Sequence, residues 1–237
     1  MAKEANQNKS SKTSSSQKSS NSSLVGKLAA IIKGKRVVVF IDGSNLYYTL
    51  QSINKKFDYS KFEQWLNKHA TLKGIHYYAA FDPEDQKQID FLNDLNGLGY
   101  TTHQKPIRWV IDHYKGNMDV ELAVDAMYYM NIYDVMILIS GDGDFSYLCQ
   151  TLEKVKRTTV ILSMGGYTAQ ELHESATNYF FLERIKSIWE YRPGRKIKQL
   201  TRAEDPELKE VAANVSSRTK LKVSNSEDSA APIIHID

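Results

Sequence analysis

Residues 37–41 read Val-Val-Val-Phe-Ile, a run that is apolar on both faces an extended chain presents. Successive side chains of a strand point to opposite sides, so such a strand is buried only in a sheet covered on both faces. Sheets of this kind are mostly parallel, and their strands alternate with helices along the chain. The run therefore predicts an α/β fold. It stops abruptly at Asp42, where the small polar stretch Gly43, Ser44 and Asn45 follows.

Strand and helix patterns alternate over residues 36–183. Short apolar runs between turn residues predict strands, and apolar residues at helical spacing predict helices. The alternation predicts a mostly parallel, Rossmann-like central sheet with helices on both faces. Residues 108–114 are expected to form a hairpin partner of the strand at 100–105. We expect strands at 36–41, 75–81, 100–105, 134–140, 158–164 and 178–183, and helices at 45–53, 59–70, 83–99, 118–131, 144–156 and 168–176.

The two ends of the chain differ from its middle in composition. Residues 1–23 are rich in Ser, Lys, Asn and Gln, with too little apolar surface to offset the entropy of ordering. We expect a disordered basic arm there, then a short helical lead-in at 24–35, a folded domain at 36–191 and a largely disordered polar tail at 192–237. The arm lacks the apolar segment of a secretory signal, and no run approaches the roughly 20 apolar residues of a membrane span. With a single cysteine, Cys149, these features favour a cytoplasmic protein without a membrane partner.

Charge is segregated along the chain, although the net charge is only +3. Residues 1–36 carry 8 Lys and Arg and one Glu, which gives +7. Residues 37–190 carry 14 Lys and Arg and 20 acids, which gives −6. A polyanion such as RNA would be attracted by the arm and repelled by the domain, unless cations occupy the domain.

Aspartates follow two of the expected strands at their carboxyl ends. Asp42 ends the first strand, and Asp142 and Asp144 follow the strand at 134–140. Asp119 opens the helix that leads into that same strand, so it starts at the same edge of the sheet. In open parallel sheets, ligands bind at this edge, where the strand order reverses. Taken singly, the last three aspartates are typical of helix N-termini. If the two strands are neighbours, however, all four carboxylates meet in one crevice.

Carboxylates crowded in this way repel one another, and cations relieve the repulsion. Asp and Asn oxygens with retained waters suit Mg²⁺ or Mn²⁺, and two such ions can clamp a phosphodiester for in-line attack. Asn45 lies close after Asp42 and can hold a water or a phosphate oxygen. Ser140 can donate a hydrogen bond to Asp42 and fix its rotamer. The sequence thus predicts a metal-dependent site for phosphodiester cleavage.

Three segments together match a known family. They read FIDGSNLY from residue 40, KGNMDVELAVDAM from residue 115 and ILISGDGDFSYL from residue 137. Over roughly residues 36–189 the chain resembles the NYN domain family, in the LabA-like (DUF88) branch of the PIN-like nuclease superfamily. The resemblance implies a PIN-like α/β sandwich and metal-dependent cleavage of RNA. It places the acidic site, catalytic and metal-binding, at Asp42, Asp119, Asp142 and Asp144, with Asn45 beside it.

The resemblance also bears on single positions around this site. Lys115 and Gly116 match a Lys-Gly pair that precedes the corresponding aspartate, Asp119, in this branch. Gly143 stands where Ser is common, which removes a hydroxyl ligand. Members of this branch include regulators without an established nuclease activity, so the family alone does not decide between catalysis and regulation.

Aromatic and basic residues near the expected crevice are candidates for binding RNA. Tyr47 and Trp109 can stack on the bases of a single strand, with Arg108 beside Trp109. We therefore favour a metal-dependent endoribonuclease that acts on single-stranded RNA. The alternative is a non-catalytic RNA- or protein-binding regulator of gene expression, with the tails as the sites for a protein partner. A haloacid-dehalogenase phosphatase is disfavoured, because Ser44 stands where its second aspartate is required, and no P-loop motif is present.

Overall fold

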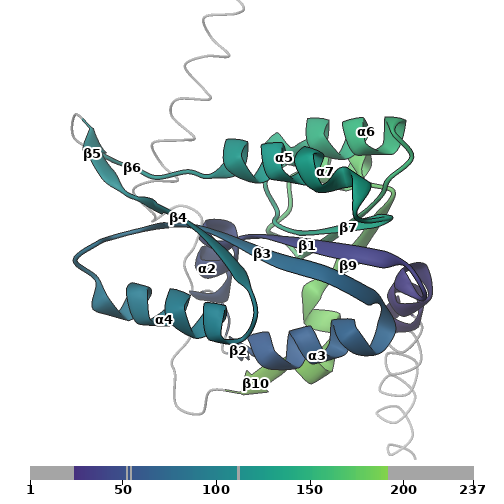
Figure 1. The fold of residues 1–237 in the computed structure, drawn as a ribbon, viewed down its shortest axis with the longest axis horizontal. Coiled ribbons are helices and arrows are strands. Elements are labelled where there is room, and N and C mark those ends of the chain that lie inside the picture. The colour runs from purple at the N-terminus through teal and green to yellow at the C-terminus, as the bar shows by residue number, and fades with distance from the viewer. Residues whose placement is uncertain (1–23, 52, 54, 111–112, 192–237) are drawn as a thin grey trace, which may run out of the picture. The chain divides into compact units, whose positions relative to one another are not determined.

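The computed structural model describes residues 24–51, 53, 55–110 and 113–191. The expected arm at 1–23 and tail at 192–237 lie outside these residues. Residues 24–32 are helical and lead into a central sheet of six strands (Figure 1). The strands are β1 (Arg36–Asp42), β3 (Thr71–Phe81), β4 (Thr101–Pro106), β7 (Val135–Ile139), β8 (Thr158–Ser163) and β9 (Asn178–Phe181).

The strand order in the sheet is β4-β3-β1-β7-β8-β9, and every adjacent pair is parallel. The chain therefore builds one half of the sheet outward from β1 and then returns to build the other half from β7. The order reverses between β1 and β7, which pair directly over residues 37–41 and 135–139. The predicted α/β fold with a mostly parallel sheet is confirmed, and so is the neighbour relation on which the convergence of acids depended.

Helices cover both faces of this sheet (Figure 1). On one face lie α2 (Gly43–Gln51), α3 (Tyr59–His69) and α4 (Gln86–Gly97), and on the other lie α5 (Asp119–Tyr128), α6 (Ser146–Lys154) and α7 (Gln170–Ser175). Short 3-10 helices are η1 (Tyr129–Asn131), η2 (Gly143–Phe145), η3 (Leu182–Arg184) and η4 (Lys186–Ile188). Among the described residues, no helix has both the length and the apolar character that a membrane crossing requires.

The two helical layers explain why β1 is apolar at successive positions. Odd-numbered residues of 37–41 enter the core shared with α2, α3 and α4. Val38 and Phe40 enter the core shared with α5, α6 and α7. Because strand side chains alternate with a period of two, position 42 belongs to the second series. Asp42 therefore lies at the end of the row that faces α5, α6 and α7.

Two small ribbons lie outside the central sheet. β5 (Arg108–Val110) pairs antiparallel with β6 (His113–Lys115), so the expected pairing of 108–114 with 100–105 is wrong. β4 instead joins β3 in parallel, because α4 returns the chain to the amino edge of the sheet before β4 begins. The second ribbon pairs β2 (Lys55–Phe57) with β10 (Trp189–Tyr191). Each of these strands has only three residues, too few to show a period-two pattern in sequence.

Candidate metal centre

Three carboxylates meet at the carboxyl edge of the sheet. Asp119 is the first residue of α5, Asp142 immediately precedes η2 and Asp144 lies within η2. One carboxylate oxygen from each of these residues lies within 4.8 Å of the other two. Asp142 also accepts a hydrogen bond at 3.0 Å from the backbone N–H of Asp144, which orients its carboxylate. Asp119 and Asp142 are partly buried and Asp144 is exposed, so the group opens toward solvent.

Asp42 is more deeply buried than these three aspartates and is not one of the group. It is only 7% exposed. Its two carboxylate oxygens accept hydrogen bonds from the N–H of Asn45 at 3.0 Å and the hydroxyl of Ser140 at 2.9 Å. Burial, together with the charges of Asp119 and Asp142, raises the pKa of Asp42 to about 6, although both hydrogen bonds act to lower it. The structure thus brings three of the four expected aspartates together, with Asp42 beneath them.

Asn45 and Ser140 tie the end of β1 to the loop after β7. The side-chain oxygen of Asn45 accepts from the N–H of Gly141 at 3.0 Å. The Ser140 oxygen accepts from the N–H of Asp142 at 3.1 Å while its own hydrogen is donated to Asp42. One hydroxyl therefore holds both aspartates in place, which is the supporting contact expected from the sequence for Asp42. Asn45 thus joins two strand ends through its side-chain oxygen, and its expected contact with a water or a phosphate oxygen stays a prediction.

Asn117 holds Asp119 and was missed by sequence analysis. Its side-chain oxygen accepts from the N–H of Asp119 at 2.8 Å, and its amide nitrogen donates to the Asp119 carboxylate. Lys105 donates to the Asn117 carbonyl oxygen at 3.3 Å and to Glu121 at 2.6 Å, which fixes the segment before α5. Burial and the charge of Asp142 raise the pKa of Asp119. The available signal was an Asn two residues before the first helical residue, which is typical of an Asx turn.

Close backbone contacts explain two of the glycines around the site. A Cβ on Gly141 would lie 1.8 Å from the carbonyl oxygen of Tyr167, and the N–H of Ala169 donates to the Gly141 carbonyl at 2.9 Å. A Cβ on Gly43 would lie 2.6 Å from the Tyr78 carbonyl oxygen. No side chain fits at either place without a shift of the backbone. The small residues after β1 and β7 therefore fix the chain that carries the aspartates.

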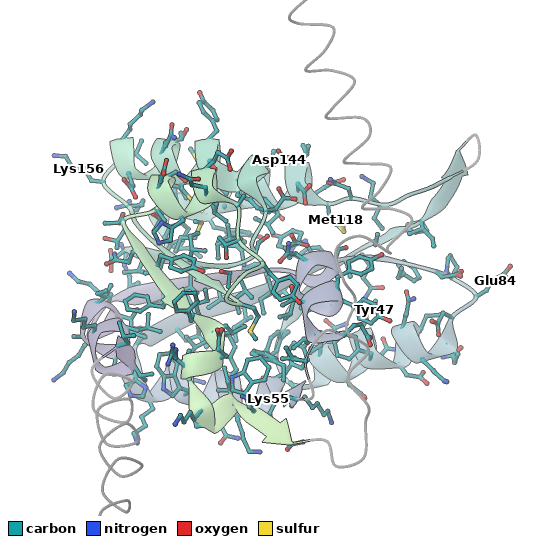
Figure 2. The ribbon with its side chains drawn as sticks, turned by 180° about the vertical axis from the view of Figure 1, so that it is seen from behind. Tyr47, Lys55, Glu84, Met118, Asp144 and Lys156 are labelled. Carbon is teal, nitrogen blue, oxygen red and sulfur yellow. The ribbon has the colours of Figure 1, made fainter. Side chains whose placement is uncertain are left out.

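The remaining predicted site residues are spread more widely. Tyr47 on α2 is 58% exposed and contacts Tyr48 edge to face, with 5.7 Å between ring centroids (Figure 2). The backbones of Arg108 and Trp109 belong to β5 and that of Lys115 to β6. The side chains of these three residues lie outside the described part of the structure, so their roles stay predictions.

A second titratable cluster joins β3, β4 and α5 but is separate from the aspartates. Nδ1 of His76 lies 3.1 Å from Nε2 of His103, and Nδ1 of His103 lies 3.5 Å from a carboxylate oxygen of Asp125. The Tyr78 hydroxyl donates to that same oxygen at 2.8 Å. Burial, and then the neighbouring His103, lower the pKa of His76 to about 4. These contacts make Asp125 part of the packing between α5 and the sheet.

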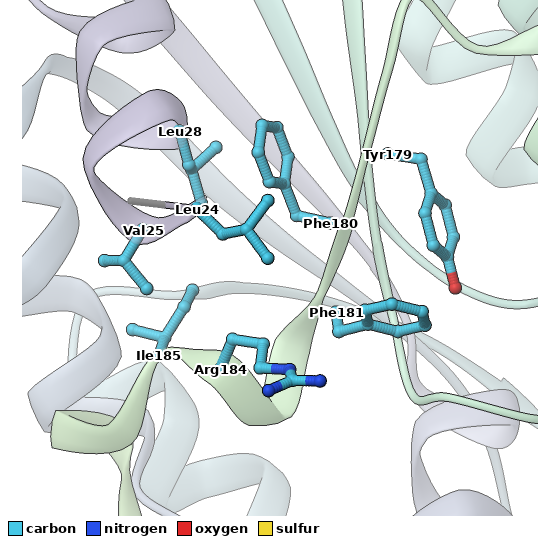
Figure 3. A pocket seen from close by; sticks show the side chains of 8 residues that line it. All are labelled: Leu24, Val25, Leu28, Tyr179, Phe180, Phe181, Arg184 and Ile185. Atoms are coloured by element: carbon cyan, nitrogen blue, oxygen red, sulfur yellow. The ribbon is translucent and has the colours of Figure 1, made fainter. Parts of the chain in front are cut away.

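An apolar pocket of about 80 Å³ lies elsewhere, between the helical residues 24–32 and β9 (Figure 3). Leu24, Leu28 and Phe180 line it, with Arg184 at one side. None of the candidate aspartates borders it. The candidate metal centre is therefore the group of carboxylates at the sheet edge, and this pocket is separate from it.

Comparison with known proteins relates most of the described fold to one family. The sequence model of the NYN domain matches residues 36–183, which contain all four aspartates. "Low amplitude and bright protein LabA" of Synechococcus elongatus is 29% identical over 165 residues, covering 65% of this chain and 88% of that protein. The crystal structure of VPA0982 from Vibrio parahaemolyticus RIMD 2210633, a protein of unknown function, matches with a TM-score of 0.57 and 28% identity. That match covers 63% of this chain and 93% of the other.

Proposed function

Because this chain belongs to the NYN domain family, we propose that it is a metal-dependent ribonuclease that hydrolyses phosphodiester bonds of single-stranded RNA. The observation that carries the proposal is the meeting of Asp119, Asp142 and Asp144, whose carboxylate oxygens lie within 4.8 Å of one another. They come from two chain segments and stand at the edge of the sheet where ligands of parallel α/β folds bind. Three carboxylates close together are unfavourable without a cation, which supports a metal-binding role.

The donor set fits a hard divalent cation. All of the converging groups are carboxylates, and oxygen ligands of this kind favour Mg²⁺ or Mn²⁺ over softer metals. Asp119, Asp142 and Asp144 would hold the ion, and the charge of Asp42 would stand behind them. A bound cation would supply positive charge to a phosphodiester and lower the pKa of a water. The raised pKa values of Asp42 and Asp119 indicate that added positive charge would be favourable there.

The surrounding residues keep this arrangement in place. Asn117 orients the Asp119 carboxylate, and Ser140 orients Asp42 and Asp142 together. On the same edge, the exposed Tyr47 offers an aromatic face on which an unpaired base can stack. This suits a single strand better than a duplex, in which the base faces are covered. Arg108, Trp109 and Lys115 remain candidates for contacts with the RNA.

The test is cleavage of end-labelled single-stranded RNA by the full chain, with Mn²⁺, with Mg²⁺ and with EDTA. We expect cleavage only with metal, and a loss of about 100-fold or more in Asp119→Asn and in Asp142→Asn. Asp94→Asn, which changes an exposed aspartate on α4, is the matched control and should cleave like the wild type. Cleavage that survives both EDTA and Asp142→Asn would refute this site. RNA binding by a wild type that never cleaves would instead support the regulator.

A further inference from the structure

Cationic side chains gather at the amino edge of the sheet, away from the aspartates. The segments that enter β3, β1 and β8 are residues 68–73, 33–36 and 154–157. Together these three segments contain eight Lys and Arg residues and no acid. We call this surface the basic edge. Figure 2 shows one of its members, Lys156, on the side of the domain opposite Glu84, which follows the carboxyl end of β3.

Main-chain hydrogen bonds place the segments of the basic edge side by side. The N–H of Thr71 donates to the Lys35 carbonyl at 2.9 Å, which joins the entries of β3 and β1. Asp134 links the entries of β1 and β8, since its N–H donates to Arg36 at 2.9 Å and its carbonyl accepts from Thr158 at 3.1 Å. Neighbouring strands lie about 4.8 Å apart. The basic edge therefore extends over roughly 14 Å, from β3 across β1 and β7 to β8.

Six lysines of the basic edge are exposed, and none of them forms an ion pair with a carboxylate of the described residues. Arg36 forms an ion pair with Asp134 at 2.7 Å. The charge of Lys35 also acts on Asp134, without an ion-pair contact. The six lysines are Lys33, Lys35, Lys68, Lys73, Lys154 and Lys156. Lys156 also has a φ of 61°, a left-handed conformation that favours Gly or Asn. Lys156 therefore places a positive charge at a backbone conformation that residues with a side chain rarely adopt.

The opposite edge has the opposite charge. Besides the candidate aspartates, the turn after β3 contributes three further acids within residues 82–85. A phosphate backbone that approached the catalytic edge alone would meet mostly negative charge. Since seven residues of β1 span about 23 Å, the two edges are close enough for one strand of RNA to contact both.

We propose that the basic edge is the surface that binds the phosphate backbone of the single-stranded RNA, while the catalytic edge holds only the nucleotides around the cleaved bond. This inference rests on the proposed ribonuclease function for the identity of the polyanion. A fully stacked strand rises about 3.4 Å per nucleotide, as in a duplex, so the basic edge spans at most roughly four phosphates. A stacked strand that also reaches the aspartates then needs about ten nucleotides.

Binding can be measured without cleavage by fluorescence anisotropy of a labelled 20-nucleotide oligouridylate in EDTA. The test variant replaces Lys33, Lys35, Lys73 and Lys156 of the full chain with Gln. The matched control replaces four exposed lysines elsewhere, and these are Lys55, Lys56, Lys87 and Lys186. Both variants lose four positive charges, so net charge cannot distinguish them. Thermal unfolding of both verifies that each is folded.

We expect the basic-edge variant to bind this RNA at least tenfold more weakly at 100 mM salt, and the control to bind nearly like the wild type. Because each lost phosphate contact on a single strand changes the slope of log affinity against log salt by about 0.7, four lost contacts should flatten it by roughly 3. Equal losses in the two variants, or no loss in the basic-edge variant, would overturn the proposal. Unchanged RNA binding with lost binding to phosphatidylserine-containing vesicles would overturn it as well.

Cleavage of short RNA separates this proposal from the proposed function. With Mn²⁺, the basic-edge variant should cleave a tetranucleotide like the wild type, because four nucleotides cannot span both edges. It should cleave the 20-nucleotide strand at least tenfold less efficiently at low substrate concentration. If the wild type cleaves nothing and the basic-edge variant still loses RNA binding, the ribonuclease function fails and the binding surface stands. If the basic-edge variant cleaves both the tetranucleotide and the 20-nucleotide strand like the wild type, the proposed binding surface is refuted and the ribonuclease function is not.

Discussion

The buried carboxylate of Asp42 should make the metal-free protein less stable as pH rises. Its pKa of about 6 lies above the ordinary value of 3.8, mainly because burial disfavours the charged form. A group whose pKa is raised on folding contributes stability that is fully present below about pH 4 and is lost as pH rises through 6. Replacement by Asn removes this titration while keeping nearly the same shape, so Asp42→Asn should be the more stable protein at neutral pH.

The size of the effect follows from the two states of the carboxyl group. A shift of about two pKa units corresponds to about 3 kcal/mol of unfolding free energy above pH 6. The Asn amide has only one acceptor oxygen, so either the Asn45 N–H or the Ser140 hydroxyl loses its present acceptor, which costs about 1 kcal/mol. The variant should therefore gain about 2 kcal/mol at pH 7.5, or roughly 4–8 °C in Tm for a domain of this size. At pH 4.5 about 1 kcal/mol of the penalty for the buried charge remains, so the two proteins should be nearly equal in stability, and the variant should become the less stable by about 1 kcal/mol only well below pH 4.

Thermal unfolding in EDTA at pH 4.5, 6.0 and 7.5 measures this difference directly. Other carboxylates titrate in the same range, but they are common to both proteins and largely cancel in the comparison. Asp94→Asn, at an exposed position, is the control and should differ from the wild type equally at all three pH values. An Asp42→Asn protein that is destabilised to the same extent at every pH would refute the reasoning, because its loss would then be one of packing alone.

Four further predictions concern metal, backbone, acid stability and the arm. In EDTA-treated protein, Mn²⁺ at a hundred times its Kd should add about 2.7 kcal/mol of unfolding free energy, and Asp142→Asn should lose most of this gain in thermal melts. Gly141→Ala should lower the unfolding free energy by about 3 kcal/mol or more in thermal melts, because its Cβ would lie 1.8 Å from a carbonyl oxygen. Gly26→Ala, whose Cβ would have no neighbour within 4 Å, should leave the unfolding free energy unchanged or raise it. The lowered pKa of His76 costs the wild type unfolding free energy as pH falls from 6.5 toward 4, so over this range the stability of His76→Phe relative to the wild type should rise, because the opposite contribution of Asp42 is common to both proteins. Deletion of residues 1–23, which carry four lysines, should weaken RNA binding and reduce its salt slope by at most about 3; an unchanged slope would assign the arm to another partner.

The fold and the position of the aspartates could be predicted because each has a local signal. The apolar run of β1 requires cover on both faces, and the period-two rule then places residue 42 on one of them. The alternation of strands and helices brings the carboxyl ends of parallel strands to one edge. What sequence could not show is that β1 and β7 are neighbours, because strand order is decided by packing over the whole chain.

Other features depend on contacts that leave little trace in sequence. Asp42 differs from the other three aspartates in its contacts, because its two oxygens accept hydrogen bonds from Asn45 and Ser140. That distinction needs interatomic distances. The ribbon of β2 and β10 joins segments more than 130 residues apart, from Lys55 to Trp189, through three residue pairs. No short-range pattern specifies such a pairing, whereas the Asx turn of Asn117 has a local signal, an Asn two residues before the start of α5.

Separate positions for RNA binding and for cleavage have a consequence for the metal. If affinity came from the catalytic edge, removal of the cation would leave Asp119, Asp142 and Asp144 facing the phosphates, and binding would weaken together with cleavage. If affinity comes from the basic edge, some 23 Å away along β1, most of that repulsion is screened, since the Debye length is about 8 Å at physiological salt. EDTA should then abolish cleavage while changing the Kd for a 20-nucleotide RNA by less than about threefold at 150 mM salt. A loss of RNA binding in EDTA that tracks the loss of cleavage would place the affinity at the aspartates and contradict the division between the two edges.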